Sequence, residues 1–413
     1  MSDSTAPGDP REPWVVREGA LSGIRVLDLT RILSGPFSSM VLADLGADVI
    51  KIEDVVGGDD TRHWGPPFHG TDAAYYHSVN RNKRSLAVDL KDAEGLALVQ
   101  RLARSADVVL ENFRPGTAER LGLGYASLSA VSPRLVYGSV SGHGHTGPLS
   151  RNAGYDAIAQ AMSGAMSVTG QPDGEPVRFG VAGADLAAGL WVTIGVLAAL
   201  QSRERTGQGQ HVDVSLVDGL ASLLTYVAQN WFASGETPRR HGSAHPNIVP
   251  YQAFPTSDGD IMIAVGNNTL WQRFAPVLGL DDLVHDPRFA TNPDRVRNRD
   301  VLLPLVEAVL ATGTTETWMH VLGEAGIPVG PVLTVPDALQ HPQLQAREMT
   351  VDLPHPVEGT VRSLGSPVKL SATPPQLRHA SPGHGEHTAE ILAAMGLADA
   401  DIERLRDGGV VKG

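Results

Sequence analysis

The sequence predicts an α/β protein with a Rossmann-like, doubly wound large domain and a smaller α+β domain. First, residues 24–29 and 47–53 are short apolar segments typical of strands, separated by a helical segment, 36–45, with proline near its first turn. Second, this alternation continues through the N-terminal half, which indicates parallel strands joined by right-handed crossovers. Third, the composition changes near Gly235, where a polar, turn-rich stretch begins. Further strands of the large domain are expected at 86–90, 107–110, 134–140 and 211–215.

Domain boundaries follow from these changes in composition. Residues 1–20 are polar, contain proline and lack the apolar segment of a secretion signal, so we expect a disordered tail on a cytoplasmic protein. We expect the large domain over 21–234, a linker over 235–248 and the small α+β domain over 249–341. Residues 342–413 combine much proline, short strand signals and a last amphipathic helix, which predicts a second linker and a C-terminal segment.

Charge and cysteine content exclude several classes of function. The chain has 413 residues and a formal net charge of −13, which argues against a general nucleic-acid or anionic-membrane surface. An anionic ligand would therefore need its own local basic patch. With no cysteine, the chain has neither disulfides nor a thiolate nucleophile, and it cannot bind zinc or iron–sulfur clusters through thiolates.

Residues 181–200 form a small and apolar run in which Asp185 is the only ionisable residue. The run predicts a helix buried on nearly every side, with Asp185 at its beginning. Asp185 is then either a simple helix cap or a carboxylate held ionised and poorly hydrated by the helix N-terminus, as a nucleophile would be. A membrane span is a third interpretation, which the aspartate, the glycines and the many alanines argue against.

Three other motifs leave alternatives open. Residues 142–147 match the Gly-x-Gly-x-x-Gly dinucleotide pattern after a strand, but a proline follows and no acidic strand end stands at the usual distance. His143 and His145, and the histidines of 384–387, lack metal-ligand spacing, so we expect loop histidines and no metal. The basic cluster at 80–85 is either a solvated loop or an anion site.

Taken together and in order, seven segments resemble the family III CoA-transferases, also called the CaiB/BaiF family. That family includes formyl-CoA and carnitine CoA-transferases and, as a branch, α-methylacyl-CoA racemase. The resemblance implies an interlocked, ring-like homodimer in which the C-terminal segment returns to the large domain. The segments are 21–28, 45–53, 80–85, 111–116, 141–144, 184–185 and 206–210.

The resemblance implies that Asp185 is the nucleophile of a CoA transfer. In that family the matching aspartate attacks an acyl-CoA thioester, and CoA moves through aspartyl anhydride and aspartyl-CoA thioester intermediates to an acceptor acid. CoA and acyl-CoA are then substrates, with no prosthetic group, no nucleic acid and no membrane as partner. A carboxylate nucleophile must stay ionised and shielded from water, which agrees with an apolar helix around it.

The resemblance also implies the residues that contact CoA, whose phosphates need local cations in an acidic protein. Two positions depart from formyl-CoA transferase: Leu33 replaces an active-site glutamine and Asp54 a CoA-contacting arginine, so formyl-CoA and oxalate are not expected as substrates. The implied contacts are Ser34, Lys91, Asn112, Phe113, Arg114, Arg120, Ser141, Gly142 and His143.

Two alternatives to a CoA-transferase remain. A racemase of the same family needs a histidine where this chain has Tyr155, and an unperturbed tyrosine is a poor base at neutral pH. A CoA-binding protein without catalysis is the second. Residues 244–254 and 265–268 are similar to the succinyl-CoA-dependent members, which suggests a dicarboxylyl-CoA donor.

Overall fold

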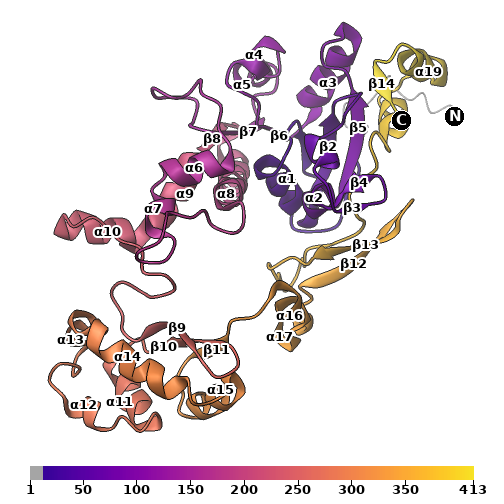
Figure 1. Cartoon of the computed structure of the whole chain (residues 1–413). Coiled ribbons are helices and arrows are strands. Elements are labelled where there is room, and N and C mark those ends of the chain that lie inside the picture. Colours follow the sequence, from indigo (N-terminus) through magenta and orange to yellow (C-terminus); the bar gives the residue numbers. More distant parts are fainter. Residues whose placement is uncertain (1–12) are drawn as a thin grey trace. The chain divides into compact units, whose positions relative to one another are not determined.

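The computed structural model describes residues 13–413 and divides the chain into two compact units (Figure 1). Unit 1 takes the chain up to Ala165, then Arg178–Thr225 and Pro342–Gly413. Unit 2 takes Met166–Val177 and Tyr226–His341. The expected boundaries therefore change at two places, because 166–177 and 226–234 belong to the smaller unit.

Arg240 connects residues 166–177 to the smaller unit. Its guanidinium donates hydrogen bonds to the carbonyl oxygens of Gln171 (3.3 Å) and Gly174 (2.7 Å). The Gly242 N–H donates to the Gly170 carbonyl at 2.9 Å. The expected linker is thus tied to an earlier turn of the chain, which a boundary drawn from local composition cannot detect.

Unit 1 is built on a seven-stranded sheet in the order β14-β5-β2-β1-β6-β7-β8. All pairs are parallel except β14 with β5, which are antiparallel. The six parallel strands, counted along the chain, lie in the doubly wound order 3-2-1-4-5-6, and this order reverses between β1 and β6. The strands are β1 Arg25–Asp28, β2 Asp48–Glu53, β5 Lys83–Val88, β6 Val108–Glu111, β7 Val136–Ser141, β8 His211–Ser215 and β14 Val411–Lys412.

Alternate residues of the strands supply two separate cores, one on each face of the sheet. Leu27 and Ile50 face the core that α3, α18 and α19 cover. Val26 and Val49 face the other core, which α1, α8 and α9 cover. The helices of unit 1 are α1 Ser34–Asp44, α2 Ala74–Val79, α3 Ala93–Ser105, α4 Thr117–Arg120, α5 Tyr125–Ser129, α6 Asp156–Met162, α8 Gly183–Thr206, α9 Leu216–Ala221, α17 Pro342–Ala346, α18 Thr388–Ala394 and α19 Asp399–Asp407.

The C-terminal segment completes this sheet. In Figure 1 the yellow strand β14 lies beside the indigo strand β5. Two hairpins, β3 Phe68–His69 with β4 Asp72–Ala73 and β12 Thr350–His355 with β13 Gly359–Leu364, and the 3₁₀ turns η1 Asp60–His63 and η2 Ser222–Leu224 finish unit 1. Along the chain, the division between the units falls after the first residue of helix α7, Ala165–Val168, and after the first residue of helix α10, Thr225–Ser234.

Unit 2 packs helices on a three-stranded antiparallel sheet of order β11-β10-β9. Trp271 and Phe274 from α11 meet Ile261 and Ile263 from β10 in its core. The α+β class expected for this part of the chain follows from that arrangement. The elements are β9 Tyr251–Pro255, β10 Asp260–Ala264, α11 Asn268–Val277, α12 Asp282–His285, α13 Asn292–Arg297, α14 Arg299–Leu310, α15 Thr315–Glu324, β11 Val329–Pro331 and α16 Val335–Gln340.

The helix expected at 181–200 is α8, but it is not buried on nearly every side. Val192 and Val196 lie in the core of unit 1, whereas Leu190, Trp191 and Ile194 are between 42 % and 52 % exposed. Both faces are apolar, so the sequence pattern could not separate them. Within residues 13–413, α8 is also the one helix that is long and apolar enough to cross a membrane by length and composition.

The basic cluster at 80–85 is neither a solvated loop nor an anion site. Lys83 and Arg84 belong to strand β5, and the cluster is buried. Each cation meets a carboxylate from a different element: Arg81 with Asp44 at 2.6 Å, Lys83 with Asp28 at 3.1 Å and Arg84 with Asp48 at 2.5 Å. These partners are 36 or more residues away in the chain, so the local sequence gave no sign of them.

The expected tail lies partly outside the described residues, since 1–12 are not described. The remaining residues, 13–20, are fixed to unit 1. The Trp14 indole N–H donates to the Ser105 hydroxyl at 2.9 Å, and the Val15 N–H donates to the Asp48 carboxylate at 2.9 Å. A disordered tail over this stretch is therefore wrong.

The packing of α19 against the sheet predicts a large difference between two adjacent substitutions. Ile402 is 4 % exposed in the core, whereas Glu403 is exposed. Ile402→Ala should lower the free energy of unfolding by about 2–5 kcal/mol, and Glu403→Ala by less than about 0.5 kcal/mol. Urea titrations of both variants measure this, and equal midpoints would contradict the packing.

Candidate active site

A cavity of about 130 Å³ opens outside the carboxyl ends of β1, β6 and β7. Three loops that follow these strands form most of its wall. Two of them follow β1 and β6, the neighbouring strands between which the strand order reverses. Open α/β sheets bind ligands at this position. The loops contribute Arg31, Ile32 and Ser34 after β1, Asn112 to Pro115 after β6, and Ser141 and Gly142 after β7.

Asp185 lines this cavity from the first turn of α8. It is not the helix cap, because the free N–H groups of Ala184 and Asp185 already donate to the Asp156 carboxylate at 2.8 and 3.3 Å. Asp156 begins helix α6, so the cap comes from another element. The Asp185 carboxylate is therefore left for another use.

Burial, and to a smaller extent the charge of Asp156, raise the pKa of Asp185 to about 7. A hydrogen bond from the Ser34 hydroxyl opposes this by stabilising the charged form. The N–H groups at the beginning of α8 do not offset this rise, because Asp156 accepts them. The carboxylate is about half protonated at neutral pH and mostly ionised at pH 8.

The contact between Asp185 and Ser34 depends on a close approach of α1 and α8. A Cβ atom at Gly189 would lie 2.7 Å from the Ser34 carbonyl oxygen and 3.1 Å from the Phe37 ring. The first clash is with backbone, so no side chain can move aside to relieve it. Gly189 thus lets α8 pack closely against the first turn of α1, which carries Ser34.

The glycine-rich turn after β7 forms a second close backbone contact. A Cβ at Gly142 would meet the Gly154 Cα at 2.6 Å, so the two glycines allow the turn to touch the segment before α6. The Ser141 hydroxyl accepts the Gly144 N–H at 2.9 Å and fixes the turn. The dinucleotide-like pattern in this sequence therefore serves to bring two stretches of backbone together beside Asp185.

A second cavity of about 240 Å³ lies outside the ends of β1, β2, β5 and β6. Arg31 and Phe113 line both cavities, so their walls share two residues. Lys91 and Asp54 line the second cavity but not the cavity of Asp185. The positive side chains of Arg31 and Lys91 meet the requirement for local cations in an acidic protein.

The structure brings together most, but not all, of the residues predicted from the sequence. Ser34, Asn112, Phe113, Arg114, Ser141 and Gly142 line the cavity with Asp185, and Lys91 lines the second cavity. Arg120 and His143 line neither cavity. Arg120 is exposed on α4 and donates to the Thr117 hydroxyl at 3.2 Å.

Sequence reasoning missed three residues near Asp185. Asp156 supplies the helix cap, and Arg31 lines both cavities. The third is Tyr75, whose pKa is raised to about 12 by burial and, to a smaller extent, by the charge of Asp185. Asp156 stands directly after Tyr155, which lines the cavity and is 62 % exposed. The one sequence signal for Asp156 was its position at the beginning of an expected helix.

The profile of CoA-transferase family III matches residues 21–388. The chain belongs to CoA-transferase family III. The resemblance drawn from the seven sequence segments is thereby confirmed, and the non-catalytic alternative loses its support. As a CoA-transferase, the protein acts on CoA thioesters and carboxylic acids.

Individual relatives extend this comparison. The chain is 43 % identical to the Agrobacterium fabrum "Succinate--glutarate CoA-transferase", over 92 % of this chain and 96 % of the relative. It is 41 % identical to the Acetobacter aceti "Acetyl-CoA:oxalate CoA-transferase", over 96 % and 99 %. A crystal structure of a CaiB/BaiF family protein from Brucella suis is 44 % identical, with a TM-score of 0.82 over 92 % of this chain and 100 % of that chain.

The raised pKa of Asp185 predicts a pH-dependent effect of Asp185→Asn on stability. Since the carboxyl group binds its proton more tightly when folded, ionisation at rising pH favours the unfolded chain. Asparagine removes this effect. The stabilisation by Asp185→Asn should grow by about 1.4 kcal/mol per pH unit from pH 4 to 7 and be constant above pH 7.

Urea unfolding at several pH values measures the effect. Asp218→Asn is the control, because Asp218 is also the third residue of a helix, α9, but is exposed. A stabilisation by Asp185→Asn that does not change with pH would contradict the raised pKa.

Proposed function

We propose that this protein transfers CoA from a dicarboxylyl-CoA, such as succinyl-CoA, to a free dicarboxylic acid, such as glutarate, with Asp185 as the nucleophile. The observation that carries the proposal is a carboxylate that is mostly buried, not used as a helix cap, and exposed to a cavity at the strand-order reversal. The name of the Agrobacterium fabrum relative supports the choice of acids.

In the first half of the proposed reaction, the Asp185 carboxylate attacks the thioester carbonyl carbon. The carbon–sulfur bond breaks, CoA leaves as a thiolate and a mixed anhydride forms on Asp185. The thiolate then attacks the aspartyl carbonyl of the anhydride, which releases the donor acid as a carboxylate and leaves an aspartyl-CoA thioester. No proton is gained or lost in these steps.

The second half runs the same chemistry in reverse with the acceptor acid. Its carboxylate attacks the aspartyl thioester, CoA thiolate leaves and a second anhydride forms. The thiolate attacks the acceptor's acyl carbonyl, which yields the new acyl-CoA and the free Asp185 carboxylate. The anhydrides hydrolyse if water reaches them, so a mostly buried nucleophile is an advantage.

Side chains around the cavity have separate parts in this proposal. The Ser34 hydroxyl stabilises charge on Asp185, and the backbone at the glycine turn of Ser141 and Gly142 is placed to stabilise the transient oxyanions. CoA extends across both cavities, with Arg31 and Phe113 at the shared wall. No prosthetic group takes part. The CoA contacts proposed within the cavities are Ser34, Lys91, Asn112, Phe113, Arg114, Ser141 and Gly142, whereas Arg120 and His143, which the family also implies, would contact parts of CoA outside them.

We also propose the interlocked homodimer implied by the family. Its support is the apolar surface of unit 1, where large side chains of α6 and α8 are exposed in the single chain. Ile158 and Met162 are 50 % and 47 % exposed on α6, and Trp191 and Ile194 are 42 % and 52 % exposed on α8. A second copy of the chain would cover them, and sedimentation equilibrium measures the stoichiometry.

The choice of acids is tested with a substrate panel. We expect succinyl-CoA with glutarate to give a kcat/KM at least about 100-fold above that of acetyl-CoA with oxalate. A site that binds the distal carboxylate of a succinyl group would leave its polar groups unpaired when the acyl group is acetyl. Initial rates of both pairs, followed by separation of the CoA esters, give the ratio. A reversed ratio would assign the chemistry of the Acetobacter aceti relative instead.

The nucleophile is tested by trapping. Incubation with succinyl-CoA followed by borohydride or hydroxylamine should modify Asp185, and peptide mass spectrometry locates the label. Asp185→Asn should lower kcat by at least about 1,000-fold, since the covalent route is lost. Asp218→Asn should keep the wild-type rate. Full activity of Asp185→Asn, with the asparagine verified by mass, would refute the mechanism.

A further inference from the structure

The loop between β1 and α1 is held in a conformation that its sequence does not favour. Ile32 has φ 75°, in the left-handed region that β-branched residues avoid. Such a residue persists only where its surroundings fix it. The loop also carries Arg31 and Ile32 in the wall of the Asp185 cavity and leads directly into Ser34.

A buried ion pair, Lys51 with Asp59, hydrogen-bonds to the backbone of this loop on both sides of Arg31. The Lys51 ammonium lies 2.8 Å from the Asp59 carboxylate and donates a hydrogen bond of 2.8 Å to the Thr30 carbonyl. The other Asp59 oxygen accepts the Ile32 N–H at 3.3 Å. Lys51 is fully buried and Asp59 is 2 % exposed, so solvent does not screen these contacts.

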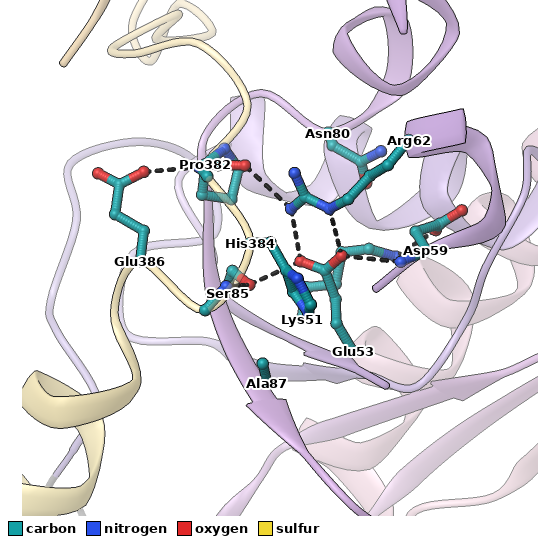
Figure 2. A network of polar contacts seen from close by, with 12 residues as sticks. Lys51, Glu53, Asp59, Arg62, Asn80, Ser85, Ala87, Pro382, His384 and Glu386 are labelled. Atoms are coloured by element: carbon teal, nitrogen blue, oxygen red, sulfur yellow. Dashed lines mark hydrogen bonds and ion pairs between the residues drawn. The ribbon is translucent and has the colours of Figure 1, made fainter. Parts of the chain in front are cut away.

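The pair is fixed in turn by a larger buried network (Figure 2). Glu53 accepts the Asp59 N–H at 3.0 Å and hydrogen bonds from Arg62 at 2.7 and 2.8 Å. Arg62 also donates to the Pro382 carbonyl, and the Ser85 hydroxyl donates to Glu53 at 2.6 Å. Figure 2 shows that Arg62 links Pro382, in the C-terminal segment, to Glu53, which in turn bonds Asp59, the partner of Lys51.

Both members of the pair are charged. Burial alone would raise the pKa of Asp59, but the charge of Lys51 and hydrogen bonds from Lys51 and Thr61 outweigh it and lower the pKa. Burial alone would lower the pKa of Lys51, and the charges of Asp59 and Asp28 outweigh that effect. A buried ion pair contributes little net stability compared with apolar residues, so its presence needs another reason.

We propose that Asp59, acting with Lys51, is a positioning residue for the nucleophile. The pair holds the backbone of Thr30 and Ile32 so that Ser34, at the beginning of α1, keeps its place beside Asp185 in the wall of the same cavity. This inference rests on the proposed role of Asp185. Lys51 and Asp59 line the second cavity, where CoA is proposed to lie, but neither lines the cavity of Asp185. They therefore do not touch the reacting atoms, and a direct effect of the pair on CoA would change KM, whereas an effect through the loop changes kcat.

Asp59→Asn tests the proposal most directly. Asparagine keeps an oxygen to accept the N–H groups of Ile32 and Thr61, but it removes the charge that faces Lys51. We expect kcat with succinyl-CoA and glutarate to fall about tenfold, because small misplacement of reacting groups is costly, with KM for succinyl-CoA changed less than about twofold.

Asp48→Asn is the matched control. Asp48 is the first residue of the same strand, β2, and so lies at the amino ends of the parallel strands, away from the cavities. It is 3 % exposed and pairs with Arg84 at 2.5 Å. It does not contact the loop before α1, so its kcat should stay at the wild-type value. An equal fall in kcat for both variants, each corrected for its folded fraction, would overturn the proposal.

A double-mutant cycle separates positioning from a general structural defect. If Asp59 acts through Ser34, then Asp59→Asn lowers kcat in the wild-type background but not in the Ser34→Ala background. Additive effects would overturn the proposal. Lys51→Arg is the second variant: it keeps the buried charge balance, and its planar group cannot reproduce the single donor at Thr30, so kcat should also fall. A folded Lys51→Arg protein with wild-type kcat would refute the role of the pair.

Hydrogen exchange on the substrate-free protein distinguishes failure of this inference from failure of the proposed function. Asp59→Asn should speed exchange of the Ile32 amide, whereas Asp48→Asn should not. If wild-type protein is labelled on Asp185 but the loop and kcat of Asp59→Asn match the control, only the positioning role fails. If wild-type protein is not labelled on Asp185, the nucleophile assignment itself fails.

Discussion

The structure of the site depends on burying the Asp185 carboxylate beside a second carboxylate, Asp156. The N-terminus of α8 would normally favour a negative charge on Asp185, but Asp156 already accepts its free N–H groups. Burial then dominates and the pKa rises to about 7. A weakly hydrated carboxylate near its pKa is more nucleophilic than one fully solvated, which is the property a covalent CoA transfer requires.

This burial requires backbone packed closely on two sides. Gly189 lets α1 approach α8, and Gly142 lets the turn after β7 meet Gly154. The doubly wound order of the sheet puts the loops after β1, β6 and β7 at one edge, where these contacts form. Beneath these loops, buried ion pairs occupy positions where a parallel sheet usually has apolar side chains, and one of them, Lys51 with Asp59, holds the loop that leads to Ser34.

Much of the fold and part of the site could be predicted from the sequence. The alternation of strands and helices located the parallel strands because each element carries its own periodicity, and the aspartate in an apolar run drew attention to Asp185. The interpretation of the basic cluster at 80–85 was wrong, since the partners of Lys83 and Arg84 lie on two other strands, β1 and β2. Residues 166–177 were assigned to the large domain, since the hydrogen bonds from Arg240 that tie this turn to the smaller unit join residues 66 and 69 positions apart. The cytoplasmic location stays a prediction.

The sequence by itself determined the family, the order of elements and the position of the acidic residue at the beginning of α8, because these are properties of local patterns and of ordered motifs. Only the tertiary structure decided that Asp156 caps that helix, that Ser34 meets Asp185 and that Lys51 with Asp59 grips the loop between them. Hydrogen bonds, ion pairs and burial join residues far apart in the chain, so the protonation state and orientation of the carboxylate follow from the packed protein as a whole.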